Sequence, residues 1–463
     1  MWNPSTQASH PLSASTGMNS TCVVNISSLH ILNTYFTPLP SRNITEHLGR
    51  KMEGRSPPLR DDRCFKNPYP KEIKDDKSQV LDEEQKALSA KYKGKLEENI
   101  KLLVDRWETN IHKGQSKPDT CVYTGTSGYS ILYLRLYHQY QEESYLNKAG
   151  DLIKQDLRSL KGRRVAFVAG DSGILALGAW YFNKIGRADK CEKCVNELLK
   201  IRQRIVAVDE YKEDEVLYGR AGYLFSLLFL LQKEVRTDLV TEEVVRDVVK
   251  AILASGQQTA QKERSRSPLM YYWHDKAYVG AAHGFIGILF MLLQAREHLE
   301  EKELQEVVRG AVDYVCNLQQ SSGNLPSSLN NTSDRLVHWC HGAPGAVFLF
   351  AKAYQVFKDA KYLQHAKKAG DCVWDRGLLQ KGYGLCHGSS GNGYALLYLY
   401  QVTGEVVYLY RAAQFGRWCQ EYGTHGCRQP DRPYSLFEGL AGNIHFLIDL
   451  LQPDEAKFPA FVV

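Results

Sequence analysis

The fold is decided by a short stretch, Gly284-Phe-Ile-Gly-Ile-Leu-Phe-Met-Leu-Leu293, in which two glycines three residues apart open a continuously apolar run. The same Gly-x-x-Gly pattern occurs seven times at intervals of 45 to 65 residues, and an apolar run follows each copy. The other six pairs are Gly125/Gly128, Gly170/Gly173, Gly219/Gly222, Gly342/Gly345, Gly388/Gly391 and Gly439/Gly442. Because self-similarity at this spacing is typical of repeated helix pairs, the sequence predicts seven copies of one helical unit.

Each unit is predicted to contain an inner and an outer helix. The run after the glycines is apolar on most faces, as in Leu224-Phe-Ser-Leu-Leu-Phe-Leu-Leu231, and such a helix has to be buried. The second helix is charged along one side, as in Tyr362-Leu-Gln-His-Ala-Lys-Lys-Ala369. We therefore predict an all-α fold, an α/α toroid (double α-barrel) of seven helix-pair repeats in a single domain. An open solenoid is the alternative, although neither end shows a polar capping repeat.

In a toroid the glycine loops converge on one mouth, where close backbone approach and turns at positive φ both favour glycine. Residues 1–60 are polar and lack apolar periodicity, so we predict a flexible extension there and the toroid over 61–463. The first helix of the toroid is predicted over Asp82–Glu108, where apolar residues follow i, i+3, i+4 spacing.

Composition excludes several classes of protein. The 463 residues are 43% hydrophobic and 24% charged, which is ordinary for a globular chain and excludes wholesale disorder. The net charge of +6 is not gathered into basic runs, so we expect no nucleic acid partner. The longest apolar runs are about half of what a bilayer requires, so no integral membrane segment is expected.

Two Cys-His pairs occupy equivalent places in neighbouring repeats. The fifth repeat reads Val337-His-Trp-Cys-His-Gly342, and the sixth reads Gly382-Tyr-Gly-Leu-Cys-His-Gly388. A single such pair would more simply be a buried thiol and a core histidine. Two pairs at matching positions favour zinc, which prefers thiolate and imidazole ligands. Cys340 and Cys386, with one or both of the following histidines, are therefore predicted to bind the metal.

Other polar residues share the register of the mouth. His283 precedes the glycines of the fourth repeat, and Glu438 precedes those of the seventh. Asp171 and Arg220 follow the first glycine of the second and third repeats. Their simpler roles would be helix capping for Asp171 and carbonyl binding for Arg220.

Two further groups are less specific. Lys381 and the segment His425–Asp431 form a polar group near the last repeats that could also be a solvated loop. Cys191 and Cys194 lie in a charged outer-helix segment, and we predict that they are surface thiols.

Longer motifs add a family resemblance. They are Leu217-Tyr-Gly-Arg-Ala-Gly-Tyr223, Tyr278-Val-Gly-Ala-Ala-His-Gly284, Arg335-Leu-Val-His-Trp-Cys-His-Gly-Ala-Pro-Gly345, Lys381-Gly-Tyr-Gly-Leu-Cys-His-Gly388, Tyr434-Ser-Leu-Phe-Glu-Gly439 and Phe458-Pro-Ala-Phe461. With these motifs in this order from about Asp61 onward, the chain resembles the eukaryotic lanthionine synthetase C-like (LanC-like) proteins, most closely their type-2 branch. The resemblance implies the toroid argued above and one zinc ion held by Cys340, Cys386 and His387.

The resemblance also implies an activity. Bacterial relatives use such a zinc to add a peptide cysteine to dehydroalanine or dehydrobutyrine, whereas eukaryotic members bind glutathione. We therefore expect a zinc-dependent glutathione transferase, whose acceptors are the dehydroamino acids left when phosphoserine or phosphothreonine in peptides or proteins loses phosphate. His341 stands where the bacterial cyclases usually carry Tyr, so peptide cyclisation is not expected. Expected catalytic residues are His283 and Asp171 as acid and base, with Arg220 as an oxyanion partner.

Glutathione itself is expected to be held by basic residues. By family resemblance these are Lys381 and the segment Arg428, Gln429, Pro430 and Asp431. The two carboxylates of glutathione would match Lys381 and Arg428 in charge. Arg63 resembles a basic residue near the family's N-terminus and is expected to help from a mobile arm.

Two other functions remain open at this point. One is a glutathione-binding signalling adaptor or receptor with a structural zinc and no turnover, with signalling kinases as the partners that the family suggests. The other is glycosidase or terpenoid chemistry on an α/α barrel, which would need paired carboxylates or Asp-rich clusters at the mouth. Asp171 and Glu438 are the acidic residues that the register offers for that role.

The cysteines and the first residues bear on location. Eleven cysteines in a chain whose beginning lacks a secretory pattern indicate a reducing compartment, so we expect a cytoplasmic protein without glycans. Nuclear or peripheral-membrane locations are the alternatives. The type-2 branch is associated with membranes through an N-terminal lipid, but Met1-Trp2 offers no glycine for N-myristoylation.

Overall fold

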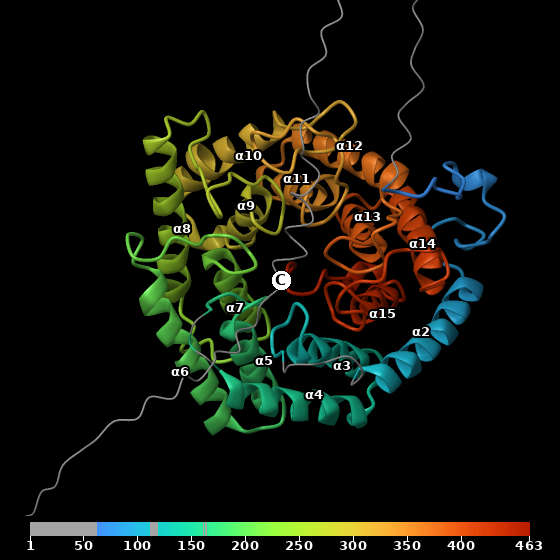
Figure 1. Cartoon of the computed structure of the whole chain (residues 1–463), viewed down its shortest axis with the longest axis horizontal. Helices are drawn as coiled ribbons and strands as arrows, with labels where there is room; N and C mark the ends of the chain where they lie inside the picture. The colour runs from blue at the N-terminus through green and yellow to red at the C-terminus, as the bar shows by residue number, and fades with distance from the viewer. Residues whose placement is uncertain (1–62, 112–118, 161, 163) are drawn as a thin grey trace, which may run out of the picture. The chain divides into compact units, whose positions relative to one another are not determined.

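A computed structural model describes residues 63–111, 119–160, 162 and 164–463, and these form two concentric layers of helices (Figure 1). The inner helices are α3 (Thr126–Tyr140), α5 (Asp171–Lys184), α7 (Arg220–Gln232), α9 (Phe285–Gln294), α11 (Ala343–Phe357), α13 (Ser389–Thr403) and α15 (Leu440–Asp449). The outer helices are α2 (Ala90–Asn110), α4 (Glu143–Asp156), α6 (Ala188–Ile205), α8 (Glu242–Lys262), α10 (Arg309–Cys316), α12 (Ala360–Arg376) and α14 (Val406–Gln420). The predicted all-α toroid of seven inner and seven outer helices is confirmed.

Short helical turns complete the described chain. They are 3-10 turns at Ile73–Asp75, Leu157–Ser159, Arg296–His298 and Pro453–Glu455, and a π-helical turn at Glu303–Val308 that leads into α10. The described residues contain isolated β-bridges but no β-strand. The predicted extension, 1–60, lies outside the described residues, so the boundary of the toroid stays a prediction.

The two ends of the helical ring pack on each other. α15 packs against both α2 and α3, so the first outer helix is the outer partner of the last inner helix. Tyr92 of α2 donates a hydrogen bond from its hydroxyl to the carbonyl of Ala413 in α14 (2.9 Å). The indole of Trp107 donates to the carbonyl of Tyr434 (2.9 Å). An open solenoid keeps its first and last repeats apart, so these contacts exclude that alternative.

Backbone hydrogen bonds also link the loops that enter the inner helices. In each link the accepting carbonyl lies two positions before a first glycine, beginning with the bond from Tyr123 N–H to the carbonyl of Val168 (3.1 Å). Cys340 N–H donates to the carbonyl of Cys386 (3.2 Å), and Cys386 N–H donates to the carbonyl of Phe437 (2.9 Å). Phe437 N–H then donates to the carbonyl of Tyr123 (3.1 Å), which joins the last repeat to the first. The two cysteines are consecutive members of this circuit.

Close approach explains the second glycine of every pair. A Cβ atom at any of the seven would overlap the carbonyl oxygen of the residue six positions earlier, such as Leu385 for Gly391. Positive φ is not the common reason that we expected. Among the first glycines, Gly342 alone has a positive φ (119°), and the other six are extended.

The first helix begins later than predicted. α2 starts at Ala90 rather than Asp82, because Ser89 is its N-cap and accepts a hydrogen bond from Tyr92 N–H (3.1 Å). The preceding segment forms a turn in which Leu81 and Leu88 make a β-bridge. The apolar residues predicted for the inward face of this helix are nevertheless all buried, namely Leu88, Tyr92, Leu96, Ile100, Leu103 and Trp107.

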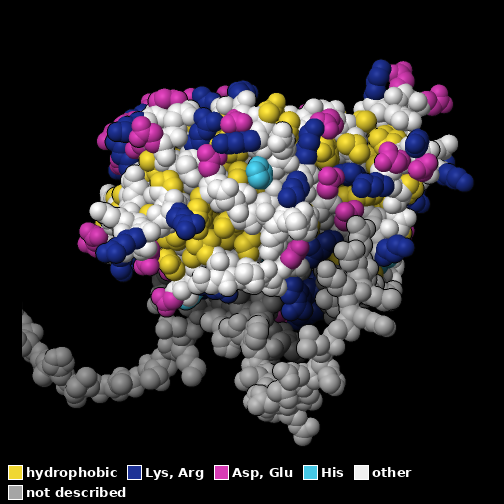
Figure 2. Space-filling view, turned by 90° about the horizontal axis from the view of Figure 1, so that it is seen from above, with side chains coloured by type: hydrophobic (Ala, Val, Ile, Leu, Met, Phe, Trp, Pro, Cys, Tyr) yellow, Lys and Arg dark blue, Asp and Glu magenta, His cyan; other side chains and the backbone are white. Residues whose placement is uncertain are grey.

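Aromatic packing fills the middle of the ring, where Figure 1 places the C-terminal residues. The rings of Phe458 and Phe461 each lie 5.0 Å from that of Trp339, the neighbour of Cys340. On the outside, basic and acidic side chains are interspersed over the face shown in Figure 2. Among the described helices, none combines the length and apolarity that crossing a membrane would need.

Candidate functional site

The position just before the first glycine of a repeat faces the mouth in repeats three to six. These residues are Tyr218, His283, His341 and His387. The rings of Tyr218 and His283 lie 6.2 Å apart, and those of His283 and His341 lie 6.4 Å apart. The position just after the first glycine is the first residue of the helix, and it faces the outer layer instead, as Thr126 does when it donates to Asp156 of α4 (2.6 Å).

Cys340, Cys386 and His387 form a compact group of potential metal ligands. Their ligand atoms all lie within 4.8 Å of one another, both cysteines are buried, and His387 is partly exposed. A hydrogen bond from the Cys386 thiol lowers the pKa of Cys340, whereas burial raises the pKa of Cys386. Two sulfurs and one imidazole suit zinc and leave a coordination position for a further ligand, so the donor set fits the predicted ion.

Three more polar groups border the cysteines without belonging to that ligand group. The Tyr123 hydroxyl hydrogen-bonds Cys386, and burial raises the pKa of Glu438 to about 7. Burial lowers the pKa of His341 to about 3, and its Nδ1 atom has no hydrogen-bond partner among the described residues. Sequence reasoning missed Tyr123, although it occupies the register position of Cys340 and Cys386.

His283 is held by a carboxylate that sequence reasoning also missed. Its Nδ1 atom lies 2.9 Å from Oε2 of Glu215, which accepts backbone hydrogen bonds from Leu217 (2.8 Å) and Tyr218 (2.6 Å). The indole of Trp273 stacks on the imidazole with ring centroids 3.8 Å apart. Burial raises the pKa of Glu215 to about 8 and lowers that of His283 to about 3. Near neutral pH the pair therefore holds one dissociable proton, and Glu215, four residues before Gly219, is part of the same mouth loop.

Backbone pairing brings three of the predicted glutathione-binding residues together. Gln380 N–H donates to the carbonyl of Arg63 (2.9 Å), and Arg428 N–H donates to the carbonyl of Gln380 (2.8 Å). Lys381 follows directly in the chain. Arg63 thus lies on a segment that is hydrogen-bonded to the toroid, and not on the mobile arm that we predicted.

The charges of Lys381 and Arg428 act on the group of potential metal ligands. After burial, Lys381 is the largest cause of the lowered pKa of His387, and Arg428 contributes as well. Arg428 is half exposed, and its Nη2 atom lies 4.0 Å from Oδ1 of Asp431. Gln429 and Pro430 lie between these two residues in the chain.

Asp171 is placed in a different environment from the one predicted. Its carboxylate accepts a hydrogen bond from Gly162 N–H (2.5 Å), and its own N–H donates to the carbonyl of Arg164 (3.1 Å). It lines a surface pocket with Lys200 and Arg204 of α6, and His283 is not among the lining residues. Asp171 therefore binds the backbone of Gly162 and Arg164 beside α6, and this placement gives no support to the acid/base role that we predict for it.

Arg220 is completely buried, which contradicts the predicted oxyanion role. Its guanidinium donates to the carbonyls of Ile205 (2.6 Å) and Tyr211 (2.6 Å) and pairs with Asp214 (2.7 Å). The simpler alternative, carbonyl binding, is confirmed. As the first residue of α7 it faces the outer layer, so it ties the inner helix to the end of α6.

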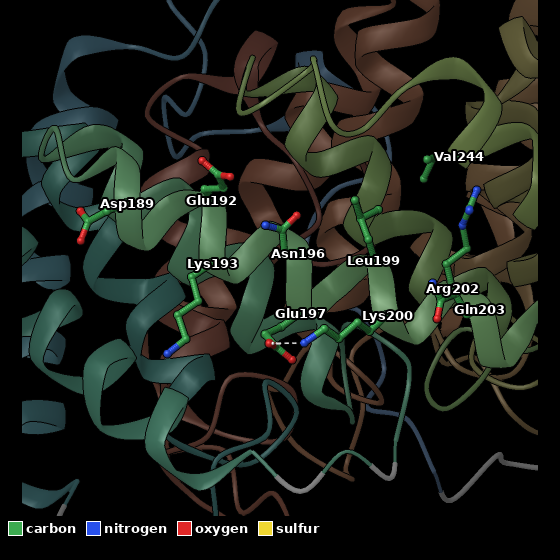
Figure 3. Close-up of a pocket in the computed structure, with 10 residues that line it drawn as sticks. All are labelled: Asp189, Glu192, Lys193, Asn196, Glu197, Leu199, Lys200, Arg202, Gln203 and Val244. Atoms are coloured by element: carbon green, nitrogen blue, oxygen red, sulfur yellow. Dashed lines mark hydrogen bonds and ion pairs between the residues drawn. The ribbon is translucent and has the colours of Figure 1, made fainter. Parts of the chain in front are cut away.

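The prediction of surface thiols at Cys191 and Cys194 is wrong, because both are buried. The two residues are three positions apart on α6, so they share its apolar face with Val195. The exposed side of α6 borders a surface cavity of about 740 Å³, shown in Figure 3, in which Lys200 pairs with Glu197 (2.7 Å). That cavity is lined by α6 and Val244 of α8 and includes none of the mouth residues.

Comparison with known proteins agrees with the fold. Residues 117–463 match the family described as lanthionine synthetase C-like protein. The Danio rerio protein named glutathione S-transferase LANCL1 is 40% identical over 407 residues, which is 88% of this chain and 100% of that protein. The solved structure of nisin cyclase matches with a TM-score of 0.58 at 14% identity, covering 78% of this chain and 94% of its own, and so shares the fold.

Proposed function

This chain belongs to the lanthionine synthetase C-like family, and on that premise we propose that it is a zinc-dependent glutathione transferase. It adds the glutathione thiol to dehydroalanine or dehydrobutyrine residues that arise in peptides or proteins from phosphoserine or phosphothreonine. The observation that carries the proposal is the meeting of two sulfurs and an imidazole, an imidazole–carboxylate pair and basic residues around one mouth. The printed name of the Danio rerio relative supports glutathione as the thiol.

Cys340, Cys386 and His387 would hold the zinc ion. When bound by two thiolates and a neutral imidazole, such an ion stabilises a further thiolate at neutral pH. The chain contributes the burial that excludes water from both cysteines and the backbone circuit that fixes their loops.

Arg63, Lys381 and Arg428 would hold glutathione through its two carboxylates. Their segments are hydrogen-bonded side by side through Gln380, which supports a common role for the three cations. Asp431, which already lies near Arg428, offers an acceptor for the ammonium group of the same ligand.

His283 and Glu215 would supply the proton that the α-carbon of the acceptor needs. When sulfur bonds the β-carbon, the electron pair of the C=C bond moves toward the acceptor's carbonyl, and the α-carbon then needs a proton. The pair donates its one dissociable proton from the imidazole, and the proton released by the incoming thiol restores it. The thiol's sulfur and hydrogen are thus both added, and nothing else is consumed.

The experiment is mass spectrometry of a single-dehydroalanine peptide incubated with glutathione and zinc-loaded protein. We expect the glutathione adduct with the wild type and with Cys372→Ala, a buried cysteine of α12 outside the ligand group. We expect Cys386→Ala to lose both zinc and adduct. Full activity of metal-free Cys386→Ala would contradict the proposal, and glutathione binding without any adduct would favour the adaptor instead.

A further inference from the structure

The mouth carries a second recognition surface, which the glutathione-binding residues do not include. It is an aromatic wall formed by Tyr218, Trp273 and Tyr278 beside His283. The ring of Trp273 stacks parallel to that of Tyr218 (centroids 5.9 Å apart, 2°). The ring of Tyr278 lies 5.9 Å from that of His283 and 5.6 Å from that of His341. The wall therefore surrounds the imidazole that we assign to proton transfer.

A tight hairpin turn holds this wall in place. Trp273 and Lys276 exchange backbone hydrogen bonds in both directions (3.1 Å each). The two residues between them, His274 and Asp275, both have positive φ (46° and 57°). This is the backbone of a type I′ turn, which here is built without glycine. Conformations of this kind cost free energy and cluster at binding and catalytic sites, so the turn is a second sign of function.

Two cations lie on this wall, each over one of the tyrosines that neighbour His283. The Arg164 guanidinium carbon lies 5.2 Å from the ring centroid of Tyr218, and the Lys276 ammonium lies 5.0 Å from that of Tyr278. Nη1 of Arg164 is buried and has no hydrogen-bond partner among the described residues. Asp171 fixes the loop that carries Arg164, through the bond from its N–H to the Arg164 carbonyl.

The acidic residues nearby do not cancel this charge. Glu215 is taken up by His283 and two backbone N–H groups. Burial raises the pKa of Glu213, which weakens its negative charge. Asp275 is exposed at the tip of the turn. The unpaired Nη1 donor of Arg164 and the positive charges of Arg164 and Lys276 therefore suit an anionic ligand at this wall.

We propose that this surface, Arg164, Tyr218, Trp273, Lys276 and Tyr278, binds the acceptor peptide and selects dehydroamino acids that have anionic side chains close by in sequence. The inference rests on the proposed function and adds the substrate class. An extended peptide advances about 3.3–3.6 Å per residue, so side chains within roughly three residues of the reacting one reach the two cations. The shared chemistry is an anionic side chain, either the carboxylate of Asp or Glu or the phosphate of a remaining phosphoserine or phosphothreonine.

Glutathione does not explain the same surface. The cations assigned to glutathione lie on the segments of Arg63, Lys381 and Arg428, beside the metal ligands. Arg164 and Lys276 come from the loops of the second and fourth repeats and lie over Tyr218 and Tyr278. The two sets leave the thiol donor on one side of the reacting centre and the acceptor on the other.

The test measures binding and turnover with matched peptides. Fluorescently labelled peptides with an unreactive alanine at the centre are flanked by Glu, phosphoserine, Gln or Lys, and their Kd values are measured by anisotropy. The corresponding dehydroalanine peptides give kcat/KM for glutathione addition. We expect Glu and phosphoserine peptides to exceed Gln peptides by about fivefold in both measurements, and Lys peptides to be weakest.

The variants separate the two proposals. Arg164→Gln combined with Lys276→Gln should remove the preference for anionic flanks, and Lys200→Gln, a cation on the outer face of α6, should keep it. Adduct formation without any charge preference, or an unchanged preference in the double variant, would overturn this inference and leave the transferase standing. Anion-selective peptide binding with no adduct on any peptide would contradict the transferase and leave the anion-binding surface standing.

Discussion

Nδ1 of His283 lies 2.9 Å from Oε2 of Glu215, although 68 residues of sequence separate the two. The contact turns a lone histidine into half of a proton-sharing pair. Because burial raises the pKa of Glu215 to about 8, the pair keeps its proton at neutral pH and loses it at higher pH. A group with a raised pKa is protonated below that value, so the form able to supply a proton is the one present below pH 8.

The first prediction concerns this pair. For the wild type, kcat for glutathione addition, corrected for the spontaneous reaction, should fall as pH rises through about 8. Glu215→Gln should lower kcat about 100-fold at pH 7 and remove that fall, because an amide does not titrate. His283→Ala should lower kcat by a similar or larger factor while glutathione binding, measured by calorimetry, persists. A wild-type pH profile in Glu215→Gln would exclude the pair as the proton donor.

The second prediction separates two neighbouring histidines. His387→Ala should lose most of its zinc, because the imidazole belongs to the compact ligand group. His341→Ala should retain one zinc per chain, although His341 has the same position in the preceding repeat. Metal content after gel filtration, measured by elemental analysis, checks both. If His341→Ala lost its zinc and His387→Ala kept it, the histidine ligand would be His341 and not His387.

The third prediction concerns the three cations. Arg63→Ala, Lys381→Ala and Arg428→Ala should each weaken glutathione binding by about three- to tenfold, with a smaller effect at high salt. The control is Arg236→Ala, a cation paired with Asp238 (2.8 Å) far along the chain on the outer surface. Calorimetric titration with glutathione at two salt concentrations gives the comparison. Equal losses in Arg236→Ala would mean that overall charge, and not these positions, is responsible.

The fourth prediction concerns the buried Arg220. Arg220→Met should destabilise the protein by about 3–5 kcal/mol, because Asp214 would stay buried without its cationic partner. Arg220→Met combined with Asp214→Asn should recover part of the loss. Thermal unfolding provides the measurement. A variant with unchanged stability and reduced kcat would restore the oxyanion role.

The fifth prediction tests the repeat glycines. Gly391→Ala should lower the melting temperature, because the added methyl group would overlap the carbonyl of Leu385. Gly94→Ala is the matched control, since a Cβ there meets nothing within 4 Å and Gly94 lies inside helix α2. That change should stabilise the protein by about 0.5–1 kcal/mol. Equal effects of the two substitutions would remove the packing argument.

The sequence was sufficient for the ring and for the meeting of Cys340 and Cys386, because both depend on register, whereas metal binding by these residues stays a prediction. Seven copies of one pattern fix which helices are buried, and Cys340 and Cys386 stand at the same place in adjacent copies. The spacing between repeats does not say which way a side chain at a helix start points. Asp171 and Arg220 begin α5 and α7, and one helical residue past the glycine already faces the outer layer.

Two of the missed residues, Glu215 and Trp273, have a different cause. Glu215 and Trp273 have no equivalent in the other repeats, so the register that located His283 carries no information about them. Their contacts to His283 come from long loops between α6 and α7 and between α8 and α9, whose course depends on packing across the mouth. Burial of Cys191 was in principle readable from its apolar neighbours on α6, but the surrounding charges obscured the stripe.

The pairing of α2 with α15 has a consequence for how the chain is made. During synthesis α2 emerges before the helices from α3 to α14, yet its apolar face packs on the last inner helix. Tyr92, Leu96, Ile100 and Trp107 must therefore wait in water, or on a chaperone, until α15 has been translated. A ribosome that stalls before α15 would release a helical chain in which the apolar face of α2 is still exposed. Such fragments should be the ones that aggregate.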